Sequence, residues 1–328
     1  MKKIISVAPM MDCTDKHDRY FLRVISKNVK LYTEMIVANA IIKGDRDHLL
    51  NFNLLEKPLA LQLGGSVPKE LAEATKIAEE YGYDEINLNL GCPSKKVQKN
   101  RFGACLLKEP ELVGECVNEM TNACNIPVTI KTRIGFDDLE DYEYLKRFIS
   151  VIKKAGSKTF IIHARRAILS KLTPKQNLNI PPLNYDFVYK IKKDFAEDTV
   201  ILNGGIDSIE KIKTSLEKVD GVMIGRAAYH SPYFLAEIEE KIFDNKDILS
   251  RYEVMEKMIP YIKEETKKGT RLNKIMRHTL GLFHGQRGSS YWKRYLSENM
   301  CVREADVQKV NHIMDHIKKN SSTIPLGS

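Results

Sequence analysis

Short apolar runs alternate with longer amphipathic stretches up to about residue 230 of the chain. Residues 85–90 (EINLNL) alternate polar and apolar side chains, which is typical of a strand. Residues 68–78 (PKELAEATKIA) and 142–154 instead repeat apolar residues at helical spacing. The pattern therefore predicts strands that alternate with helices. The eight predicted strands are residues 4–8, 31–33, 59–63, 85–90, 127–132, 159–163, 200–203 and 221–224.

Eight successive βα units over about 230 residues match an α/β fold of the (β/α)8 TIM-barrel type in both number and length. A doubly wound open sheet is the alternative. Such sheets more often have about five to seven strands, and their first turn carries a glycine fingerprint that this chain lacks. The order and number of the units therefore favour the barrel.

The pattern changes after Pro232, where strand-like runs give way to helical ones. Four helical segments with short connections predict a C-terminal four-helix bundle. We therefore expect a barrel domain over residues 1–240 and a helical domain over residues 241–328. The predicted helices of the second domain are residues 252–267, 273–283, 289–300 and 304–319.

Composition places the chain among soluble proteins, with 43% hydrophobic and 29% charged residues. No apolar run approaches the roughly 18 residues that span a bilayer, and the first residues, Met1 to Lys3, show no signal-peptide pattern. The six cysteines lack the spacing of a zinc site. These features predict a cytoplasmic protein with reduced thiols, no metal and no membrane contact.

Positive charge is concentrated in the last part of the chain. Residues 241–328 carry 17 Lys and Arg against 10 Asp and Glu, out of a formal net charge of +9 for the whole chain. A basic segment attached to a nearly neutral body suggests a polyanionic partner. A solvated helical surface explains the same charge equally well, so charge alone does not decide between them.

Nearly every predicted strand ends in polar, ionisable or glycine residues, which indicates catalysis because TIM-barrel active sites lie at these ends. The last two strands are followed by Asn203, Gly204 and Gly205 and by Gly225 and Arg226. Glycine lets backbone N–H groups approach phosphate oxygens, and arginine adds a charged hydrogen bond. These turns predict a phosphate site, although tight turns alone also explain the glycines.

A phosphate site together with Gln62, Lys131 and His163 at other strand ends fits flavin mononucleotide (FMN). Gln62 can bond the edge of the ring, and Lys131 can place positive charge beside the part that becomes anionic on reduction. Residues 9–11 (Pro-Met-Met) would add backbone and apolar contacts. Considered alone, Lys131 also fits a Schiff-base lysine, and His163 also fits a structural histidine.

Cys92 follows the fourth predicted strand in the sequence NLNLGCPSKK. A thiol with a reference pKa of about 8.5 is mostly protonated at neutral pH but can still give up its proton. The flanking Gly91 and Pro93 restrict the turn. A lone cysteine is usually a buried, inert residue. The position of Cys92 at a strand end instead predicts a proton donor to a carbon–carbon double bond that a flavin reduces.

Eight motifs in order resemble the bacterial tRNA-dihydrouridine synthase family: VAPMMDCTDKHDRYF, YTEM, ALQLGGS, EINLNLGCPSKKVQKNRFGACLL, PVTIKTRIG, FIIHAR, LNGGI and DGVMIGRAAYHSP. Residues 160–185 are similar to the subfamily that acts on positions 20 and 20a of the tRNA D-loop. The resemblance covers about residues 4–240 with high specificity, and the helical remainder more loosely.

The resemblance implies FMN-dependent reduction of uridine to 5,6-dihydrouridine, with NADPH as the reductant and Cys92 as the proton donor to C5. Asn89, at the same strand end as Cys92, is placed to hold the edge of the base. Cys105 lies past the turn, and we expect it to be structural or loop-borne. Cys13 adjoins the expected flavin site, and no role in the chemistry follows from that position. The implied FMN contacts are Pro9, Met10, Met11, Gln62, Lys131, His163, Asn203, Gly204, Gly205, Gly225 and Arg226.

Two other segments are predicted to contact tRNA. The loop over residues 165–182 is unusually long and is rich in Arg, Lys, Gln and Asn, including Gln176 and Asn179. In the helical domain, Tyr291 and Arg294 have side chains that stack on bases or bind phosphate. Trp292 between them is expected to lie in the helical core. We expect a monomer that binds tRNA through its basic helical domain.

Two rival functions differ from this one. An FMN-dependent dehydrogenase of a free pyrimidine would share the barrel and part of the Asn-x-x-Cys-Pro turn, but not a basic helical appendage. A non-catalytic RNA-binding barrel would bind no flavin, so it would be colourless, whereas a flavoprotein absorbs near 450 nm (roughly the flavin band).

Overall fold

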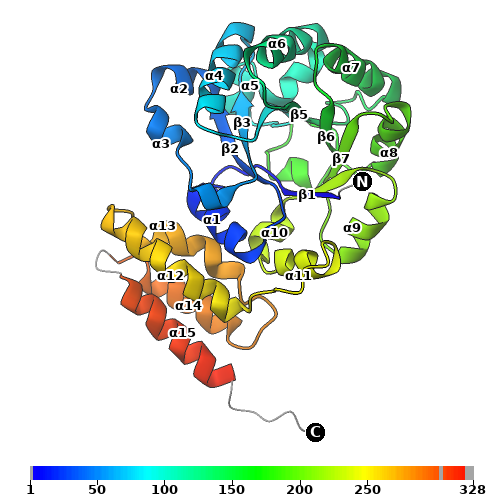
Figure 1. Ribbon diagram of the computed structural model, residues 1–328. Coiled ribbons are helices and arrows are strands. Elements are labelled where there is room, and N and C mark those ends of the chain that lie inside the picture. The colour runs from blue at the N-terminus through cyan, green and yellow to red at the C-terminus, as the bar shows by residue number, and fades with distance from the viewer. Residues whose placement is uncertain (1–2, 303–305, 322–328) are drawn as a thin grey trace. The chain divides into compact units, whose positions relative to one another are not determined.

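Eight parallel strands form one sheet in the computed structural model, which describes residues 3–302 and 306–321. Neighbouring strands follow the order β1-β8-β7-β6-β5-β4-β3-β2, so from β2 to β8 each strand pairs with the next along the chain, and β8 pairs with β1 (Figure 1). The strands are β1 (Ile4–Val7), β2 (Leu31–Val37), β3 (Leu59–Gly64), β4 (Glu85–Leu90), β5 (Val128–Arg133), β6 (Thr159–His163), β7 (Thr199–Asn203) and β8 (Gly221–Ile224).

The sheet closes into a barrel at Lys30, the residue before β2. The Lys30 N–H donates to the Ile5 carbonyl, and the Lys30 carbonyl accepts the Val7 N–H, both at 2.9 Å. Ser6 and Lys30 form the corresponding parallel bridge. The predicted (β/α)8 barrel is therefore confirmed, and the open-sheet alternative is excluded.

The helices that follow strands β2 to β7 lie around the outside of the barrel (Figure 1). Local sequence signals start several of them: Pro68 opens α4, and Asp141 accepts the Glu143 N–H at the start of α7. The helices up to β8 are α1 (Lys16–Ile25), α2 (Ala38–Lys43), α3 (Arg46–Leu50), α4 (Pro68–Glu80), α5 (Lys95–Lys99), α6 (Pro110–Ala123), α7 (Tyr142–Lys154), α8 (Tyr185–Asp194) and α9 (Ile209–Leu216), with 3-10 turns η1 (Leu54–Glu56), η2 (Gly103–Lys108) and η3 (Gln176–Leu178).

The helical segment after the last strand agrees with the predicted positions. Residues 273–283 are split between a short α-helix and a 3-10 turn, and Glu304 of the last predicted helix lies outside the described residues. Helix α15 packs against α12 and α14. The elements are α10 (Arg226–His230), α11 (Phe234–Lys241), α12 (Arg251–Lys267), α13 (Leu272–Met276), η4 (Arg277–Gly281), α14 (Ser289–Asn299) and α15 (Val307–Ser321).

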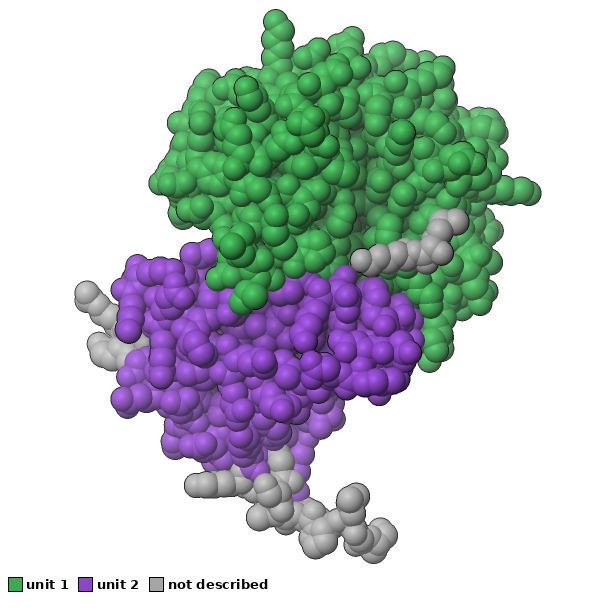
Figure 2. Space-filling view, viewed as in Figure 1, with its two compact units in different colours: residues 1–14, 29–225 green, residues 15–28, 226–328 purple. Residues whose placement is uncertain are grey.

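The chain divides into two compact units at a different place from the predicted boundary at residue 240. One unit comprises residues 1–14 and 29–225, and the other comprises residues 15–28 and 226–328 (Figure 2). The reason is that α1 is tied to the helices. Glu239 of α11 accepts hydrogen bonds from Ser26 and Asn28, and Asp15 accepts one from Arg277 at 2.7 Å.

The interior of the barrel has an apolar face and a polar face. Six buried residues pack together on the apolar face, and Ile4 and Met10 pack against them. The polar face consists of inward side chains of β3, β4 and β5, which are described below. The six apolar-face residues are Ala8, Tyr32, Ala60, Ile161, Ile201 and Met223.

Candidate active site

The turn after β4 carries the predicted proton donor. The Asn89 side-chain oxygen accepts hydrogen bonds from the backbone N–H groups of Gly91 (3.1 Å) and Cys92 (3.0 Å). Asparagine commonly organises a turn in this way. The Cys92 carbonyl in turn accepts the Ala104 N–H at 2.9 Å. The Cys92 backbone is thus held at two points, at the end of the barrel where TIM-barrel active sites lie.

The Cys92 thiol is half-buried and lies near two cations. Burial raises the pKa of this thiol above its usual value, while a backbone hydrogen bond at Ser94 and the charges of Arg133 and Lys131 partly oppose the rise. Because the net pKa is raised, Cys92 is a thiol at neutral pH. A group that donates a proton must first hold it, so this protonation state fits the predicted role.

Buried amides connect the turn to the barrel interior. Asn89 Nδ2 donates to Gln62 Oε1 at 2.7 Å, and Gln62 Nε2 donates to Asn87 Oδ1 at 2.8 Å. The predicted flavin contact Gln62 and the predicted base contact Asn89 therefore lie together. Both lone pairs of the Asn89 oxygen already accept backbone N–H groups, so one Nδ2 hydrogen is what Asn89 can offer a base.

The hydrogen-bonded chain continues to a buried carboxylate. Asn87 Nδ2 donates to Thr129 Oγ1 at 2.9 Å, and the Thr129 hydroxyl donates to Glu85 Oε1 at 2.7 Å. Glu85 also accepts hydrogen bonds from Tyr32 (2.7 Å) and from the Lys30 amine (2.6 Å). These residues line the polar face of the barrel, from the start of β4 to its end.

Glu85, Asn87 and Thr129 are not among the predicted site residues, although the sequence of β4 contains a signal for two of them. In EINLNL the polar residues Glu85, Asn87 and Asn89 recur at every second position, and the strand is buried on both faces. A buried period-two row of polar side chains must find partners inside the barrel. The alternation alone does not show on which side of the sheet these polar side chains lie.

Lys131 lies on β5 in register with Asn89. Burial and the charge of Arg133 lower the pKa of Lys131 to about 7, whereas Cys92 opposes the shift. No carboxylate of the described residues contributes to this balance. The amine therefore lacks a neutralising partner in residues 3–302 and 306–321, and an anionic ligand beside it would raise its pKa and favour the charged form.

Arg133 is a functional candidate that the sequence analysis missed. It shares a face of β5 with Lys131, because the two residues are two positions apart. Its Nε donates to the Gly91 carbonyl at 2.9 Å, and its Nη1 donates to the carbonyls of Arg166 (3.1 Å) and Asn177 (3.2 Å). Arg133 therefore links the Cys92 turn to the long loop after β6.

The turn after β7 brings His163 and two glycines together. Gly204 and Gly205 have φ angles of 109° and 70°, which favour glycine. A Cβ on Gly204 would lie 3.3 Å from His163 Nε2, and one on Gly205 would lie 2.7 Å from Leu183. The Tyr185 hydroxyl donates to the Gly204 carbonyl at 2.6 Å. This packing by itself requires both glycines, so the phosphate contact stays a prediction.

Pro9, Met10 and Met11 follow β1, as predicted. The Met10 N–H donates to Thr14 Oγ1, and the Met10 carbonyl accepts the Thr14 N–H, both at 3.0 Å. These bonds fix the loop and leave the Met11 side chain 56% exposed. A Cβ on Gly225 would lie 4.0 Å from the Met10 sulfur, so the loop and the end of β8 lie side by side.

Asn203 and Arg226 show features that the sequence did not reveal. The Asn203 side chain is buried, and its Nδ2 donates to the Met223 carbonyl at 2.8 Å, which joins β7 to β8. This amide hydrogen is therefore engaged within the barrel. Arg226 is exposed and is the first residue of α10, in the second compact unit.

The long loop between β6 and α8 folds around a buried asparagine. Asn177 Oδ1 accepts the Ile168 N–H at 2.7 Å, and Asn177 Nδ2 donates to the Thr173 carbonyl at 3.2 Å. The predicted RNA contacts Gln176 and Asn179 lie on either side of Asn177 and are exposed. The loop is thus an ordered segment with polar side chains on its outer surface.

In the helical unit, the predicted core residue Trp292 is fully buried and donates to the Thr279 carbonyl at 2.9 Å. That prediction is confirmed. Tyr291 is half-buried and stacks on His316, with ring centroids 4.2 Å apart. Arg294 is exposed, and its guanidinium lies 5.5 Å from the Tyr291 ring. The two predicted tRNA contacts of this unit therefore lie together.

All six cysteines are free. The Cys105 Sγ lies 3.2 Å from the Phe102 carbonyl in η2, and burial raises the pKa of its thiol. Cys105 is thus held within the segment whose Ala104 N–H bonds to Cys92, as its predicted structural role requires. The Cys13 N–H donates to the Met10 carbonyl at 3.1 Å, so the Cys13 backbone helps fix the loop after β1.

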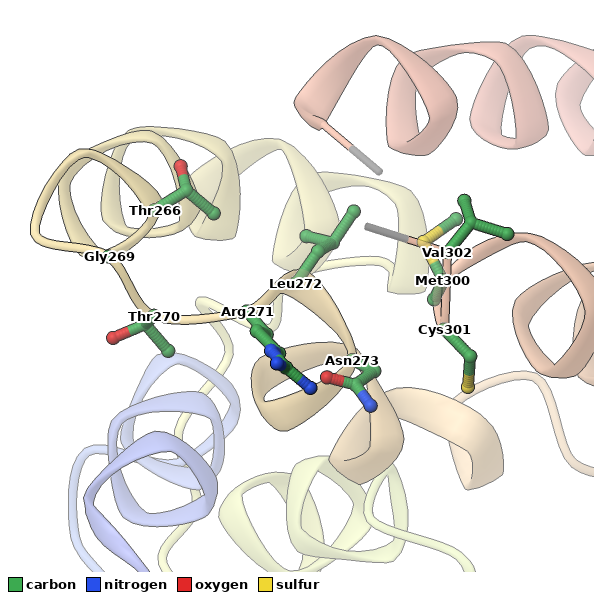
Figure 3. Close-up of a pocket in the computed structure, with 9 residues that line it drawn as sticks. All are labelled: Thr266, Gly269, Thr270, Arg271, Leu272, Asn273, Met300, Cys301 and Val302. Carbon is green, nitrogen blue, oxygen red and sulfur yellow. The ribbon is translucent and has the colours of Figure 1, made fainter. Parts of the chain in front are cut away.

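A pocket of about 500 Å³ lies in the helical unit, between the α12–α13 turn and the end of α14 (Figure 3). Arg271, Asn273 and Cys301 are among its lining residues. None of the predicted site residues lines this pocket. It is therefore separate from the side chains that meet at the strand ends.

Membrane-spanning helices and clusters of metal ligands are both absent from the described residues. Within residues 3–302 and 306–321, no helix combines the length and apolar character needed to cross a bilayer. In the same part of the chain, no group of three or more His, Cys, Asp and Glu side chains is arranged to hold a metal ion.

Comparison with known proteins assigns the family. The model of the dihydrouridine synthase family matches residues 6–320. The chain belongs to the dihydrouridine synthase family. The curated relatives of this synthase include tRNA-dihydrouridine(20/20a) synthases from Shewanella oneidensis, 51% identical over 94% of this chain and 92% of the relative, and from Escherichia coli K12, 50% identical over 94% and 90%.

The same name belongs to a Synechocystis relative that is 50% identical over 92% of this chain and 90% of its own. Among solved structures, a 2-naphthoyl-CoA reductase in complex with 2-naphthoyl-CoA superimposes with a TM-score of 0.54 and 11% identity. That match covers 72% of this chain and 50% of the reductase chain, and it supports the barrel fold alone.

Proposed function

We propose that this dihydrouridine synthase reduces uridine to 5,6-dihydrouridine at positions 20 and 20a of tRNA. The relatives named for this reaction match this chain over nearly its whole length. The observation that carries the proposal is the β4 turn, where Asn89 holds a protonated Cys92 near Lys131. This arrangement fits the delivery of a proton to a ring carbon beside a bound, electron-rich cofactor.

FMN would supply the hydride for this reduction. The residues fit such a group, because the Lys131 amine has no carboxylate partner in the described chain and an anionic group beside it would favour its charged form. Gln62 keeps a free amide hydrogen for the ring edge. The glycines after β7 and β8 would hold the phosphate, with Arg226 adding charge. We propose NADPH as the source of the electrons.

The residues of the chain perform three tasks in this proposal. Cys92 holds the proton that C5 of uracil receives, and Arg133 fixes the turn by binding the Gly91 carbonyl. Asn89 offers one amide hydrogen to the base edge. The target base must leave its stack to reach these groups, at a cost of a few kcal/mol that is smallest in a flexible loop.

We propose that two surfaces bind the tRNA outside the reacting base. The first is the loop after β6, with Gln176 and Asn179 exposed on it. The second is the basic helical region over residues 241–328, where Arg294 lies beside the Tyr291 ring. Arginine and tyrosine supply charge and stacking for an RNA strand. A cytoplasmic monomer is the form that we propose carries out the reaction.

The experiment that tests this function uses the purified chain with FMN, NADPH and tRNA transcribed without modifications. We expect dihydrouridine at positions 20 and 20a, detected by primer extension after alkaline treatment. Free uracil and uridine serve as competing substrates. Turnover of free uracil at the rate of tRNA would favour the pyrimidine dehydrogenase, and a preparation that never absorbs near 450 nm (roughly the flavin band) would exclude both enzymes.

A further inference from the structure

The buried chain of hydrogen bonds from Cys92 to Glu85 runs in a single direction. Each side chain donates to the next: Asn89 to Gln62, Gln62 to Asn87, Asn87 to Thr129, and Thr129 to Glu85. An amide or a hydroxyl can both donate and accept, so each intermediate member could be turned either way. What determines the direction must therefore lie at the ends of the chain.

The two ends are of opposite kinds. At one end, the backbone N–H groups of Gly91 and Cys92 can only donate, so Asn89 must present its oxygen. At the other end, a carboxylate can only accept, so Thr129 must donate. Donors at one end and an acceptor at the other agree with one orientation of every amide between them, and hydrogen bonds in such a chain strengthen one another.

Glu85 is held as an acceptor by its other partners. The side chain is 3% exposed, the Lys30 amine lies 2.6 Å from its Oε2, and the Tyr32 hydroxyl donates to its Oε1 at 2.7 Å. Lys30 lies next to β1 and β2 and is itself partly exposed. The cation thus stabilises negative charge at the end of the barrel far along β4 from Cys92.

We propose that Glu85 is a positioning residue that sets the orientation of the amides and so holds the Cys92 turn in its reactive form. It does so through Thr129, Asn87, Gln62 and Asn89. The catalytic part of this inference rests on the proposed function, whereas the control of the turn does not. No described contact joins Glu85 directly to Cys92, so the effect must pass along the chain.

Replacing the Glu85 carboxylate by an amide is expected to reverse the donor and acceptor roles along the chain of hydrogen bonds. In Glu85→Gln, the Lys30 cation attracts the new amide oxygen, which turns the NH2 group toward Thr129. The Thr129 hydroxyl then accepts from this NH2 group, and its other described acceptor, the Ile86 carbonyl, lies 3.5 Å away, at the limit of a hydrogen bond. Turning Asn87 so that its oxygen accepts from Thr129 restores a short hydrogen bond, and we expect Gln62 and Asn89 to turn over in the same way. Asn89 finally presents its NH2 group to the N–H groups of Gly91 and Cys92, and the turn loses its acceptor.

Removing the cation provides the matched rescue. In Glu85→Gln with Lys30→Met, nothing attracts the amide oxygen to the Lys30 side, so the oxygen can again accept from Thr129. We expect Glu85→Gln alone to lower kcat for uridine reduction on the order of tenfold to a hundredfold, the range for one buried hydrogen bond. The double variant is expected to recover most of this loss.

The second measurement needs neither FMN nor tRNA. The rate at which iodoacetamide alkylates Cys92 is measured in the FMN-free protein by mass spectrometry of the Cys92 peptide. Because an opened turn exposes the thiol, we expect Glu85→Gln to speed alkylation on the order of tenfold and the double variant to restore the slow rate. Cys301, which is exposed, serves as the internal reference.

A second pair of variants covers the case in which Glu85→Gln does not fold. Thr129→Val breaks the chain, whereas Thr129→Ser keeps the hydroxyl, so Val and not Ser is expected to speed alkylation. Tyr32→Phe removes a Glu85 hydrogen bond outside the chain and is expected to leave the alkylation rate unchanged.

Equal alkylation in Thr129→Val and Thr129→Ser, or in Glu85→Gln with and without Lys30→Met, would overturn the proposal. A change in alkylation with no change in uridine reduction would retain the control of the turn and contradict the role of Cys92 in the proposed function. The two failures are thus distinguished.

Discussion

The two faces of the barrel interior differ in how strongly their contacts depend on the orientation of the side chains. The apolar face packs Ile161, Ile201 and Met223 together, and such contacts are non-directional and scale with buried area. The polar face consists of hydrogen bonds that require each donor to meet an acceptor. A small change in an apolar side chain therefore lowers stability. A small change on the polar face instead reorients side chains several hydrogen bonds away.

The apolar face thus stabilises the fold, and the polar face holds the residues proposed for the chemistry. Tyr32 belongs to both faces, because its ring lies in the apolar cluster and its hydroxyl donates to Glu85. Burial and the Glu85 charge raise the pKa of Tyr32 well above its usual value, so the hydroxyl remains a donor. The predictions below test whether stability and activity divide between the two faces.

The largest effect is expected at the end of the polar face. Cys92→Ala should fold normally but reduce uridine in tRNA about 10² to 10⁴ times more slowly, the usual worth of a general acid. Single-turnover reduction of tRNA by the pre-reduced flavoprotein measures this step, because the flavin absorbance near 450 nm (roughly the flavin band) returns as the reduced flavin is oxidised. Cys105→Ala is the matched control, because its thiol bonds only to the Phe102 carbonyl among the described residues.

If Cys92→Ala and the wild type turn over equally, the proton comes from elsewhere and the β4 turn is only structural. If Cys105→Ala is as slow as Cys92→Ala, the loss reflects damage to the shared segment around Ala104. The thermal unfolding midpoint of each variant separates these cases, since removal of a half-buried thiol changes stability little.

On the apolar face, by contrast, a substitution should lower the free energy of unfolding and leave kcat nearly unchanged. Ile201→Ala removes buried methyl groups from a side chain that is 2% exposed, so unfolding should become easier by about 2–5 kcal/mol. The kcat at a temperature where the variant is folded should stay within about twofold. Urea unfolding measures the first quantity, and Ile201→Val, at about 0.5–1.5 kcal/mol, gives the graded control. A kcat that falls in proportion to stability would contradict the division.

Sequence predicted the strands well because burial within a parallel barrel leaves a clear apolar signal. All eight predicted strands are present, and only β2 is markedly longer than expected. The ends of the strands were equally informative, since Gln62, Asn89, Cys92 and Lys131 meet there. Such ends are fixed by topology, so residues far apart in sequence can be placed together without knowing any contact.

What sequence did not reveal depends on partners. Nothing in the sequence near Arg133 shows that it binds the carbonyls of Gly91 and Asn177. Likewise, α1 follows a barrel strand but clusters with the helical unit, because Asp15 and Ser26 find their partners there. These are pairings between distant segments, and the periodicity of a sequence carries no information about such partners.

The smallest effect concerns the amine of Lys131 on the polar face. Its pKa falls to about 7 in the folded protein from an ordinary value near 10.5, so between these values the unfolded chain binds a proton that the folded chain does not. By linkage, the FMN-free wild type should gain stability relative to Lys131→Met as pH rises from 7 to 10. We expect about 1–2 kcal/mol, because solvent reaches the half-buried amine.

Urea unfolding at pH 7 and 9.5 measures the difference, with the exposed Lys69→Met as the control. Identical pH dependence in all three proteins would contradict the lowered pKa of Lys131, because its amine would then titrate like that of a surface lysine.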